Sequence, residues 1–369
     1  MACVVIDYNS HGTAVAKRVN PANTLAKEVD VTLRGRGILI TNLGSPASPT
    51  PPAVKAYLEE FLMDPHVVTL PTPLRYLLVK AIARTRCHAS AAAYAAIWTN
   101  SGGPLRDHAQ QLAQKVRQAT GLPVAVGMRY GEPSFAEAVN ELREHCDDIL
   151  VISAFPQYAK STYASSVQCL QQVTHDISVH ITAPYYADSA YIHAYRNLLA
   201  KHLASDVEHL LFSFHGIPEM HLRQTDESGA HCLRSKHCCD SAHPSHARCY
   251  RFQCLTTARL LGEGQAVPTS VSFQSRLGRA QWLQPYTVDR VKNLAQSGIK
   301  RLAVSCPAFI SDNLETLFEI GHEARELFLD AGGERLDLIP CLNSSSAWVD
   351  RVVAWCRAPS ESHVALTDA

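Results

Sequence analysis

Short apolar runs alternate with longer amphipathic stretches from about residue 37 onward. Apolar runs of four to eight residues bounded by turn residues are typical of buried strands, and apolar positions three or four apart are typical of helices. The pattern predicts strands at residues 37–43, 124–128, 148–154, 179–183, 209–214, 269–273, 301–305 and 335–339. It predicts helices at residues 51–62, 105–119, 135–145, 189–204, 287–297 and 313–329, the third opened by a Ser134–Glu137 capping box.

This alternation predicts βαβ units with parallel strands and therefore an α/β protein. We expect two Rossmann-like domains, residues 36–184 and 185–343, each with a four-stranded parallel sheet flanked by helices, and a cleft between them. Residues 1–35 have weak periodicity and are predicted to be an N-terminal extension. Residues 228–254 form a cysteine-rich insert in the second domain, and residues 344–369 a C-terminal helix and tail.

Composition excludes several classes of protein. The 369 residues include 34 Lys and Arg and 34 Asp and Glu, so no basic excess favours nucleic-acid binding. Residues 1–30 lack the pattern of an export signal, and no run approaches the ~18 apolar residues of a membrane span. We therefore expect a cytoplasmic protein, in which clustered cysteines are metal ligands rather than disulfides.

Polar and aromatic segments directly follow several predicted strands. In open parallel sheets, ligands bind outside the carboxyl ends of the strands. An aromatic and apolar lining there would suit a large, flat ligand. The candidate lining residues are Tyr57, Phe61, Tyr130, Tyr158, Trp282 and Phe309.

His215 lies between a predicted strand and a tight turn that begins at Gly216. A neutral imidazole in that position can accept a proton or bind a metal. The alternative is a histidine that only bonds the loop backbone.

Glu315, Glu319 and Glu323 are spaced four residues apart, which places three carboxylates on one face of a helix. A bound cation would relieve their repulsion. Two alternatives remain open: Asp312 and Glu315 could form a capping box, and the other two carboxylates could face solvent.

Five of the chain's 12 cysteines fall within residues 232–254, mixed with several histidines. Thiolates gathered in one polar loop suit Zn²⁺ or an iron–sulfur cluster. The spacing does not choose between these metals.

Seven short motifs together resemble the ferrochelatase family, in the same order and over residues 37–343. They are TNLGSP at 41–46, MRY at 128–130, FPQY at 155–158, SFHGIP at 213–218, FQSRLG at 273–278, WLQP at 282–285 and DNLETLFE at 312–319. The resemblance implies an enzyme that inserts Fe²⁺ into protoporphyrin IX, forming protohaem and releasing two protons. Coproporphyrin III, or another tetrapyrrole and metal, is the alternative. The implied partners are a porphyrin and ferrous iron.

The resemblance also implies roles for individual residues. His215 matches the family's histidine, Glu315 the glutamate across the porphyrin plane, and Glu319 a second carboxylate behind it. His215 and Glu315 are the expected Fe²⁺ contacts. Asn313 stands where some members carry histidine, so no role for an imidazole is transferred there. The candidate substrate-binding residues are Tyr57, Arg129, Tyr130, Tyr158, Ser275 and Trp282.

The cysteine-rich insert resembles that of bacterial members that hold a [2Fe–2S] cluster internally. This resemblance implies Cys232, Cys238, Cys239 and Cys249 as ligands, with Cys254 as the alternative to one of the adjacent pair. Residues 70–80 match a lip of the family's cleft, so we expect peripheral contact with the inner membrane surface. Both a monomer and a homodimer remain open.

Overall fold

The structure is a computed structural model that describes residues 4–8, 14–18, 35–276, 278 and 280–368. Its first large sheet contains β3 (Arg36–Asn42), β4 (Val124–Met128), β5 (Asp148–Ser153), β6 (Ser178–Ile181) and β11 (Val364–Ala365). The strand order is β11-β6-β5-β3-β4, and only β11 is antiparallel to its neighbour. The order places the carboxyl ends of four parallel strands at one edge of the sheet.

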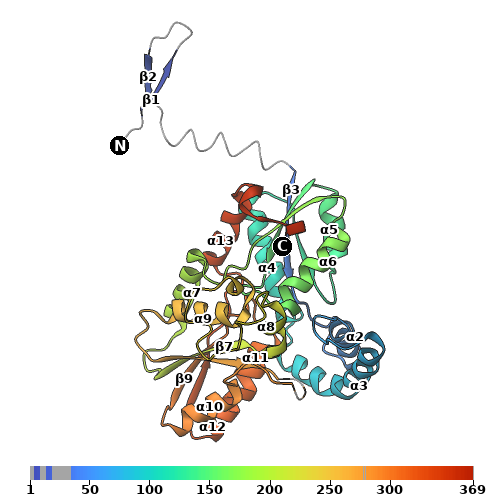
Figure 1. The fold of residues 1–369 in the computed structure, drawn as a ribbon, viewed down its shortest axis with the longest axis vertical. Helices are drawn as coiled ribbons and strands as arrows, with labels where there is room; N and C mark the ends of the chain where they lie inside the picture. The colour runs from blue at the N-terminus through green and yellow to red at the C-terminus, as the bar shows by residue number, and fades with distance from the viewer. Residues whose placement is uncertain (1–3, 9–13, 19–34, 277, 279, 369) are drawn as a thin grey trace.

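The second large sheet repeats this arrangement. It contains β7 (His209–His215), β8 (Thr269–Gln274), β9 (Arg301–Ser305) and β10 (Arg335–Leu338), all parallel, in the order β10-β9-β7-β8. Counted in chain order, the first parallel strand of each sheet lies between the second and the third, and the fourth lies next to the third at the edge of the parallel part. The order and pairing of the strands confirm the predicted α/β class, the eight parallel strands and their division into two sheets, and Figure 1 shows their arrangement.

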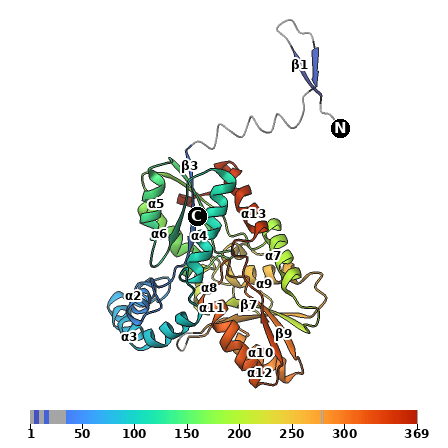
Figure 2. The same ribbon diagram turned by 180° about the vertical axis from the view of Figure 1, so that it is seen from behind.

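Helices pack on the faces of both sheets and beside them (Figures 1 and 2). They are α2 (Pro51–Leu62), α3 (Thr72–Ile97), α4 (Pro104–Thr120), α5 (Phe135–Arg143), α6 (Ser165–Val173), α7 (Ser189–His202), α8 (Glu219–Thr225), α9 (Tyr250–Gly262), α10 (Thr287–Gln296), α11 (Leu314–Leu317), α12 (Arg325–Asp330) and α13 (Ser346–Arg357). Two π-helical segments, η1 (Lys160–Ala164) and η3 (Glu319–Ala324), and three 3₁₀ segments, η2 (Pro244–Arg248), η4 (Ser360–Ser362) and η5 (Leu366–Asp368), complete the set. The Ser134–Glu137 capping box is present at the start of α5.

Several segments differ from the sequence-based expectation. The predicted helix at 313–329 is divided into α11, η3 and α12. The long helix α3 was not predicted, because Leu74 and Leu77 are exposed while the charged Arg75 is buried, which blurs the apolar pattern. Within the N-terminal extension, β1 (Val4–Tyr8) and β2 (Ala14–Arg18) form an antiparallel pair that was also not predicted. The rest of residues 1–34 lies outside the described residues.

The C-terminal segment contributes to the first sheet. Strand β11 lies beside β6, and Leu366 is buried in the hydrophobic cluster that contains Leu39 of β3. The Arg36 guanidinium binds the Asp148 carboxylate at 3.0 Å and the Ala358 carbonyl oxygen at 2.7 Å. The antiparallel β11 escaped prediction because a two-residue strand has no periodicity to detect.

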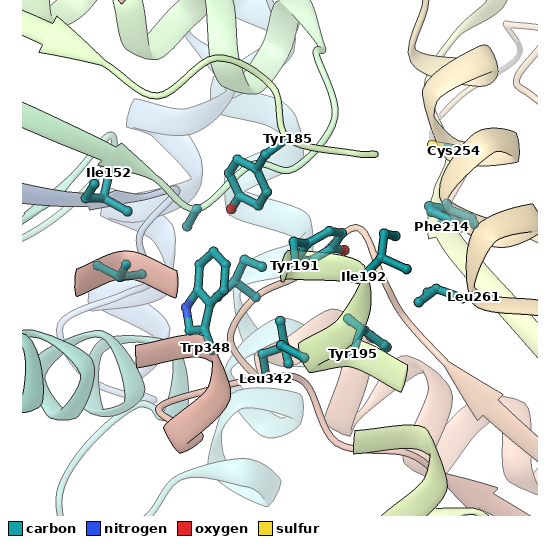
Figure 3. Packing of buried hydrophobic residues seen from close by; sticks show 14 of the residues in the cluster. Ile152, Tyr185, Tyr191, Ile192, Tyr195, Phe214, Cys254, Leu261, Leu342 and Trp348 are labelled. Carbon is teal, nitrogen blue, oxygen red and sulfur yellow. The ribbon is translucent and has the colours of Figure 1, made fainter. Parts of the chain in front are cut away.

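One hydrophobic cluster runs continuously through both domains. It extends from Ile38 of β3 to Leu210 of β7. Between them, Tyr185, Tyr191 and Trp348 pack with ring centroids 5.3–6.2 Å apart (Figure 3). Because burial of aromatic surface contributes strongly to stability, this shared core fixes the two domains relative to one another.

Candidate active site

A cavity of about 970 Å³ is lined by residues that follow strands of both large sheets. Residues at or just beyond the ends of β3, β7 and β8 line it, including Asn42, His215 and Gln274. Helices α2 and α3 contribute Tyr57 and Tyr94 to its wall. The volume is at the upper end of the usual range for ligand sites, so a large ligand fits.

Two glycines allow the loops around the cavity to approach closely. Gly44 has a φ of +108°, and a Cβ there would lie 1.8 Å from the Tyr130 carbonyl oxygen. A Cβ on Gly216 would lie 2.8 Å from the Gln274 carbonyl oxygen. Any larger residue would separate these loops.

His215 ends β7 and lines the cavity. Its Nδ1 lies 2.6 Å from the Gly216 carbonyl oxygen. Because a carbonyl can only accept, Nδ1 carries the proton and Nε2 keeps a free lone pair. Burial lowers the pKa of His215 below its usual 6.5, although the charge of Glu315 and the bond to Gly216 oppose this shift. The imidazole is therefore neutral at pH 7.

The Glu315 side chain is not part of a helix cap, so the alternative of an Asp312–Glu315 capping box does not hold. The Asn313 side chain caps α11 instead, accepting from the backbone N–H groups of Glu315 and Thr316 at 2.8 and 3.2 Å. Asp312 accepts hydrogen bonds from the Asn343 amide and the Cys341 backbone. The Glu315 carboxylate remains available to the cavity that it lines.

Glu319 is held in a largely buried position on η3. The Ser275 hydroxyl donates to its Oε2 at 2.6 Å. Ser275 adopts a φ of +60°, which is sparsely populated for residues other than glycine. Burial, with a further contribution from Glu315, raises the pKa of Glu319 from 4.5 to about 8. Glu319 is thus mainly protonated at pH 7, whereas the exposed Glu323 at the cavity wall is in contact with solvent.

The predicted substrate-binding residues divide into two groups. Tyr57, Ser275 and Trp282 line the cavity. Tyr57 donates to the Gly44 carbonyl oxygen at 3.1 Å, and Phe61 stacks on its ring.

Arg129, Tyr130 and Tyr158 are not among the described residues that line this cavity. Arg129 and Tyr130 both donate to the buried Asp64 carboxylate, at 2.6 and 2.8 Å. Tyr158 packs beside Tyr163, with ring centroids 5.8 Å apart. A residue's position in a motif that follows a strand does not tell whether its side chain faces the cavity or packs inside the protein behind the cavity wall.

Several lining residues were absent from the sequence-based set. Arg86 and Tyr94 come from α3, and His221 from α8. Neither α3 nor α8 was predicted, and these side chains belong to none of the motifs found in the sequence, so the sequence did not indicate them.

The cysteine-rich insert is organised around Asp226. Its carboxylate accepts from the Ser228 and Ser245 hydroxyls, both at 2.6 Å, and from the Cys232 backbone N–H at 2.8 Å. These bonds fold the loop back on itself, which brings distant cysteines together.

Four thiols meet in this loop. The Cys249 thiol interacts with those of Cys232 and Cys239, and the Cys238 and Cys239 sulfurs are 3.9 Å apart. Arg251 Nη1 lies 3.1 Å from the Cys239 sulfur and 3.7 Å from that of Cys238.

Cys254 differs from these four thiols. It lies within α9, whereas the other four precede that helix, and its thiol interacts with Tyr250. Within the described residues, no three or more His, Cys, Asp or Glu side chains are arranged to hold a single metal ion.

Comparisons with known proteins agree with this architecture. The family model described as "Ferrochelatase" matches residues 35–359. A ferrochelatase of Pseudomonas fluorescens (strain Pf0-1) is 44% identical over 333 residues, covering 87% of this chain and 98% of the relative. One of Azotobacter vinelandii is 44% identical over 332 residues, with the same coverage.

A solved structure shares the fold. SirB from Bacillus subtilis with Fe³⁺ has a TM-score of 0.52 at 12% identity, covering 90% of this chain and 99% of that one. The matched residues include all eight parallel strands and the described residues that line the cavity. The chain belongs to the ferrochelatase family.

Proposed function

We propose that this chain inserts Fe²⁺ into protoporphyrin IX, forming protohaem and releasing two protons. The observation that carries the proposal is one large cavity whose wall presents both a neutral histidine and a set of carboxylates. Metal insertion needs both, because two pyrrole protons must leave while Fe²⁺ exchanges its water for nitrogen ligands. The family to which the chain belongs supports the same reaction.

His215 is the proposed proton acceptor. Its Nδ1–H is held by the Gly216 carbonyl, so Nε2 is the atom that accepts the proton. The negative charge of Glu315 acts on this ring and would stabilise the imidazolium that forms.

The carboxylates of α11 and η3 are the proposed route for iron and protons. Glu315, Glu319 and Glu323 all line the cavity, from the largely buried Glu319 to the exposed Glu323. Carboxylate and imidazole ligands bind Fe²⁺ more weakly than thiolates do, so the ion can move on into the ring.

The aromatic wall is the proposed porphyrin-binding surface. Tyr57 and Trp282 provide apolar contact, and Ser275 orients Glu319. Contact energy distant from the ring centre can offset the cost of distorting the macrocycle so that its nitrogen lone pairs point at the metal.

Anaerobic incubation of the protein with Fe²⁺ and protoporphyrin IX tests this proposal, with the shift of the Soret band followed over time. We expect turnover with protoporphyrin IX and slower turnover with coproporphyrin III. Insertion into coproporphyrin III alone would reverse the substrate assignment. No insertion into either porphyrin would contradict the proposal.

A [2Fe–2S] cluster in the insert is a second part of the proposal. The four thiols that meet there, Cys232, Cys238, Cys239 and Cys249, fit a cluster that takes four cysteine ligands. Burial raises the pKa of Cys232 and Cys238, so these thiols would ionise readily only beside a metal. When bound, the cluster would supply structural stability or redox sensing at this loop.

Metal and sulfide analysis of anaerobically purified protein distinguishes the cluster from zinc. We expect two irons and two acid-labile sulfides per chain, lost in Cys249→Ala and kept in Cys254→Ala. One zinc without sulfide would instead indicate a structural zinc loop.

Peripheral membrane contact is the third part. Leu74, Tyr76 and Leu77 near the start of α3 are 52–66% exposed, and Lys80 follows them. An exposed apolar patch beside basic residues is typical of a surface that lies on a membrane. No helix in the described part of the chain has both the length and the apolarity to cross a bilayer. We propose a cytoplasmic location with contact through this patch.

Liposome flotation tests the contact. Wild-type protein should float with anionic vesicles, and a Leu74→Gln/Leu77→Gln variant should float less. Equal flotation of the two proteins, or none by either, would argue against contact through α3.

A further inference from the structure

A corner of the cavity, which we call the polar corner, is formed by Lys160, Ser161, Thr162 and His221. Ser161, Thr162 and His221 line the cavity, and Lys160 is adjacent in η1. His221 lies on α8 and is only 4% exposed. Its Nδ1 is buried with no hydrogen-bond partner. Because Nδ1 is sealed from the cavity, the ring nitrogen that can meet a ligand is Nε2, which has no hydrogen-bond partner among the described residues.

The Ser161 and Thr162 hydroxyls of the polar corner are both available for hydrogen bonding. Across the part of the chain that the structure describes, neither the Ser161 nor the Thr162 hydroxyl has a hydrogen-bond partner. Each can therefore donate to a ligand that enters the cavity.

The charges around His221 favour an anion. Lys160 and His66 are the titratable groups that act on His221, and within the described residues no carboxylate does so. Lys160 donates to the neutral Gln224 side chain at 3.1 Å, and His66 pairs with Gln168 at 2.7 Å. The charge of Lys160 is thus not neutralised by an acidic partner.

This chemistry contrasts with that of the carboxylate wall on α11 and η3. A porphyrin carries apolar substituents and carboxylates on its rim. A carboxylate would be repelled by Glu315 and Glu323, whereas an acceptor-only group satisfies an imidazole N–H and two hydroxyls at once. A metal cation would be repelled by Lys160.

We propose that the polar corner is a subsite for a carboxylate of the porphyrin side chains. The inference rests on the proposed function, since it requires a porphyrin in this cavity. It assigns Lys160, Ser161, Thr162 and His221 to substrate orientation, because fixing one rim carboxylate fixes the rotation of the ring above His215.

Porphyrin fluorescence titration without iron tests the subsite independently of catalysis. The probes are protoporphyrin IX and its dimethyl ester, both in the same detergent. We expect Lys160→Gln and Thr162→Val each to weaken binding of the free acid about fivefold, with little effect on the ester. Lys201→Gln, which changes an exposed lysine on α7, is the matched control and should bind both probes like wild type.

Raising the salt concentration should weaken acid binding to wild type more than to Lys160→Gln, because screening acts on the charge that the variant lacks. Equal loss of acid and ester binding in the variants, or no loss in either, would overturn the subsite. Failure of wild-type protein to bind either porphyrin would instead contradict the proposed function.

Discussion

Replacing Glu319 by glutamine should stabilise the folded protein while removing activity. Glu319 is forced into a largely buried position beside Glu315, which raises its pKa to about 8. The folded state therefore keeps a proton that the unfolded state releases above its ordinary pKa of 4.5. Glutamine carries no ionisable proton and can still accept the hydrogen bond from Ser275.

The magnitude follows from linkage. Because the unfolded state binds fewer protons than the folded state between pH 4.5 and 8, the wild-type free energy of unfolding falls as pH rises through this interval. The glutamine variant lacks this loss. Each pH unit contributes about 1.4 kcal/mol, so the advantage of the variant reaches about 3 kcal/mol at pH 7. It disappears near pH 4.5 and levels off above pH 8.

Urea unfolding of both proteins at several pH values from 4.5 to 8.5 measures this difference, with iron insertion assayed in parallel. Glu141→Gln, an exposed change on α5, is the control and should show no pH-dependent gain. A variant that is no more stable than wild type at pH 7, or whose gain is constant with pH, would refute the reasoning. Retained activity would show that the carboxylate is not needed for insertion.

Three further substitutions test other residues of the site and its wall. His215→Ala should lower the rate of iron insertion by roughly 10²–10⁴-fold, while porphyrin fluorescence still reports binding; near-normal turnover would show that another group takes the protons. Glu315→Gln should also lose activity but keep its melting temperature within a few degrees, because Asn313 caps the helix; a stability loss without an activity loss would contradict this. Asp64→Asn should cost roughly 3 kcal/mol in urea unfolding, since it weakens a buried pairing with Arg129. Burial alone would raise the pKa of Asp64, but its hydrogen bonds and Arg129 outweigh burial, so the net pKa is lowered. The loss of stability in Asp64→Asn should therefore fade as the pH drops below about 4, where Asp64 of the wild type becomes protonated. A stability loss that persists at low pH would show that it does not come from the charge of Asp64.

The pattern of residues along the chain is sufficient to predict the α/β class and the eight parallel strands. Continuous apolar runs separated by helical stretches have few other solutions, because strands buried on both faces need crossover helices. The ordered motifs, from TNLGSP at 41–46 to DNLETLFE at 312–319, are likewise sufficient to indicate the family. Each of these signals lies within a short stretch of chain, so it can be read without knowledge of the surface that the stretch packs against.

Which side chains meet depends on tertiary packing. The sequence around Arg129 and Tyr130 does not show whether these side chains face the cavity or bind Asp64. The tertiary structure shows that both donate to Asp64. Asn313, rather than Asp312, caps α11, because Asp312 is taken by partners from residues 341–343. The raised pKa of Glu319 and the unpartnered His221 likewise arise from burial by segments far away in the sequence. Periodicity reports which face of an element is buried, but the group that meets a buried side chain is set by how separate elements pack.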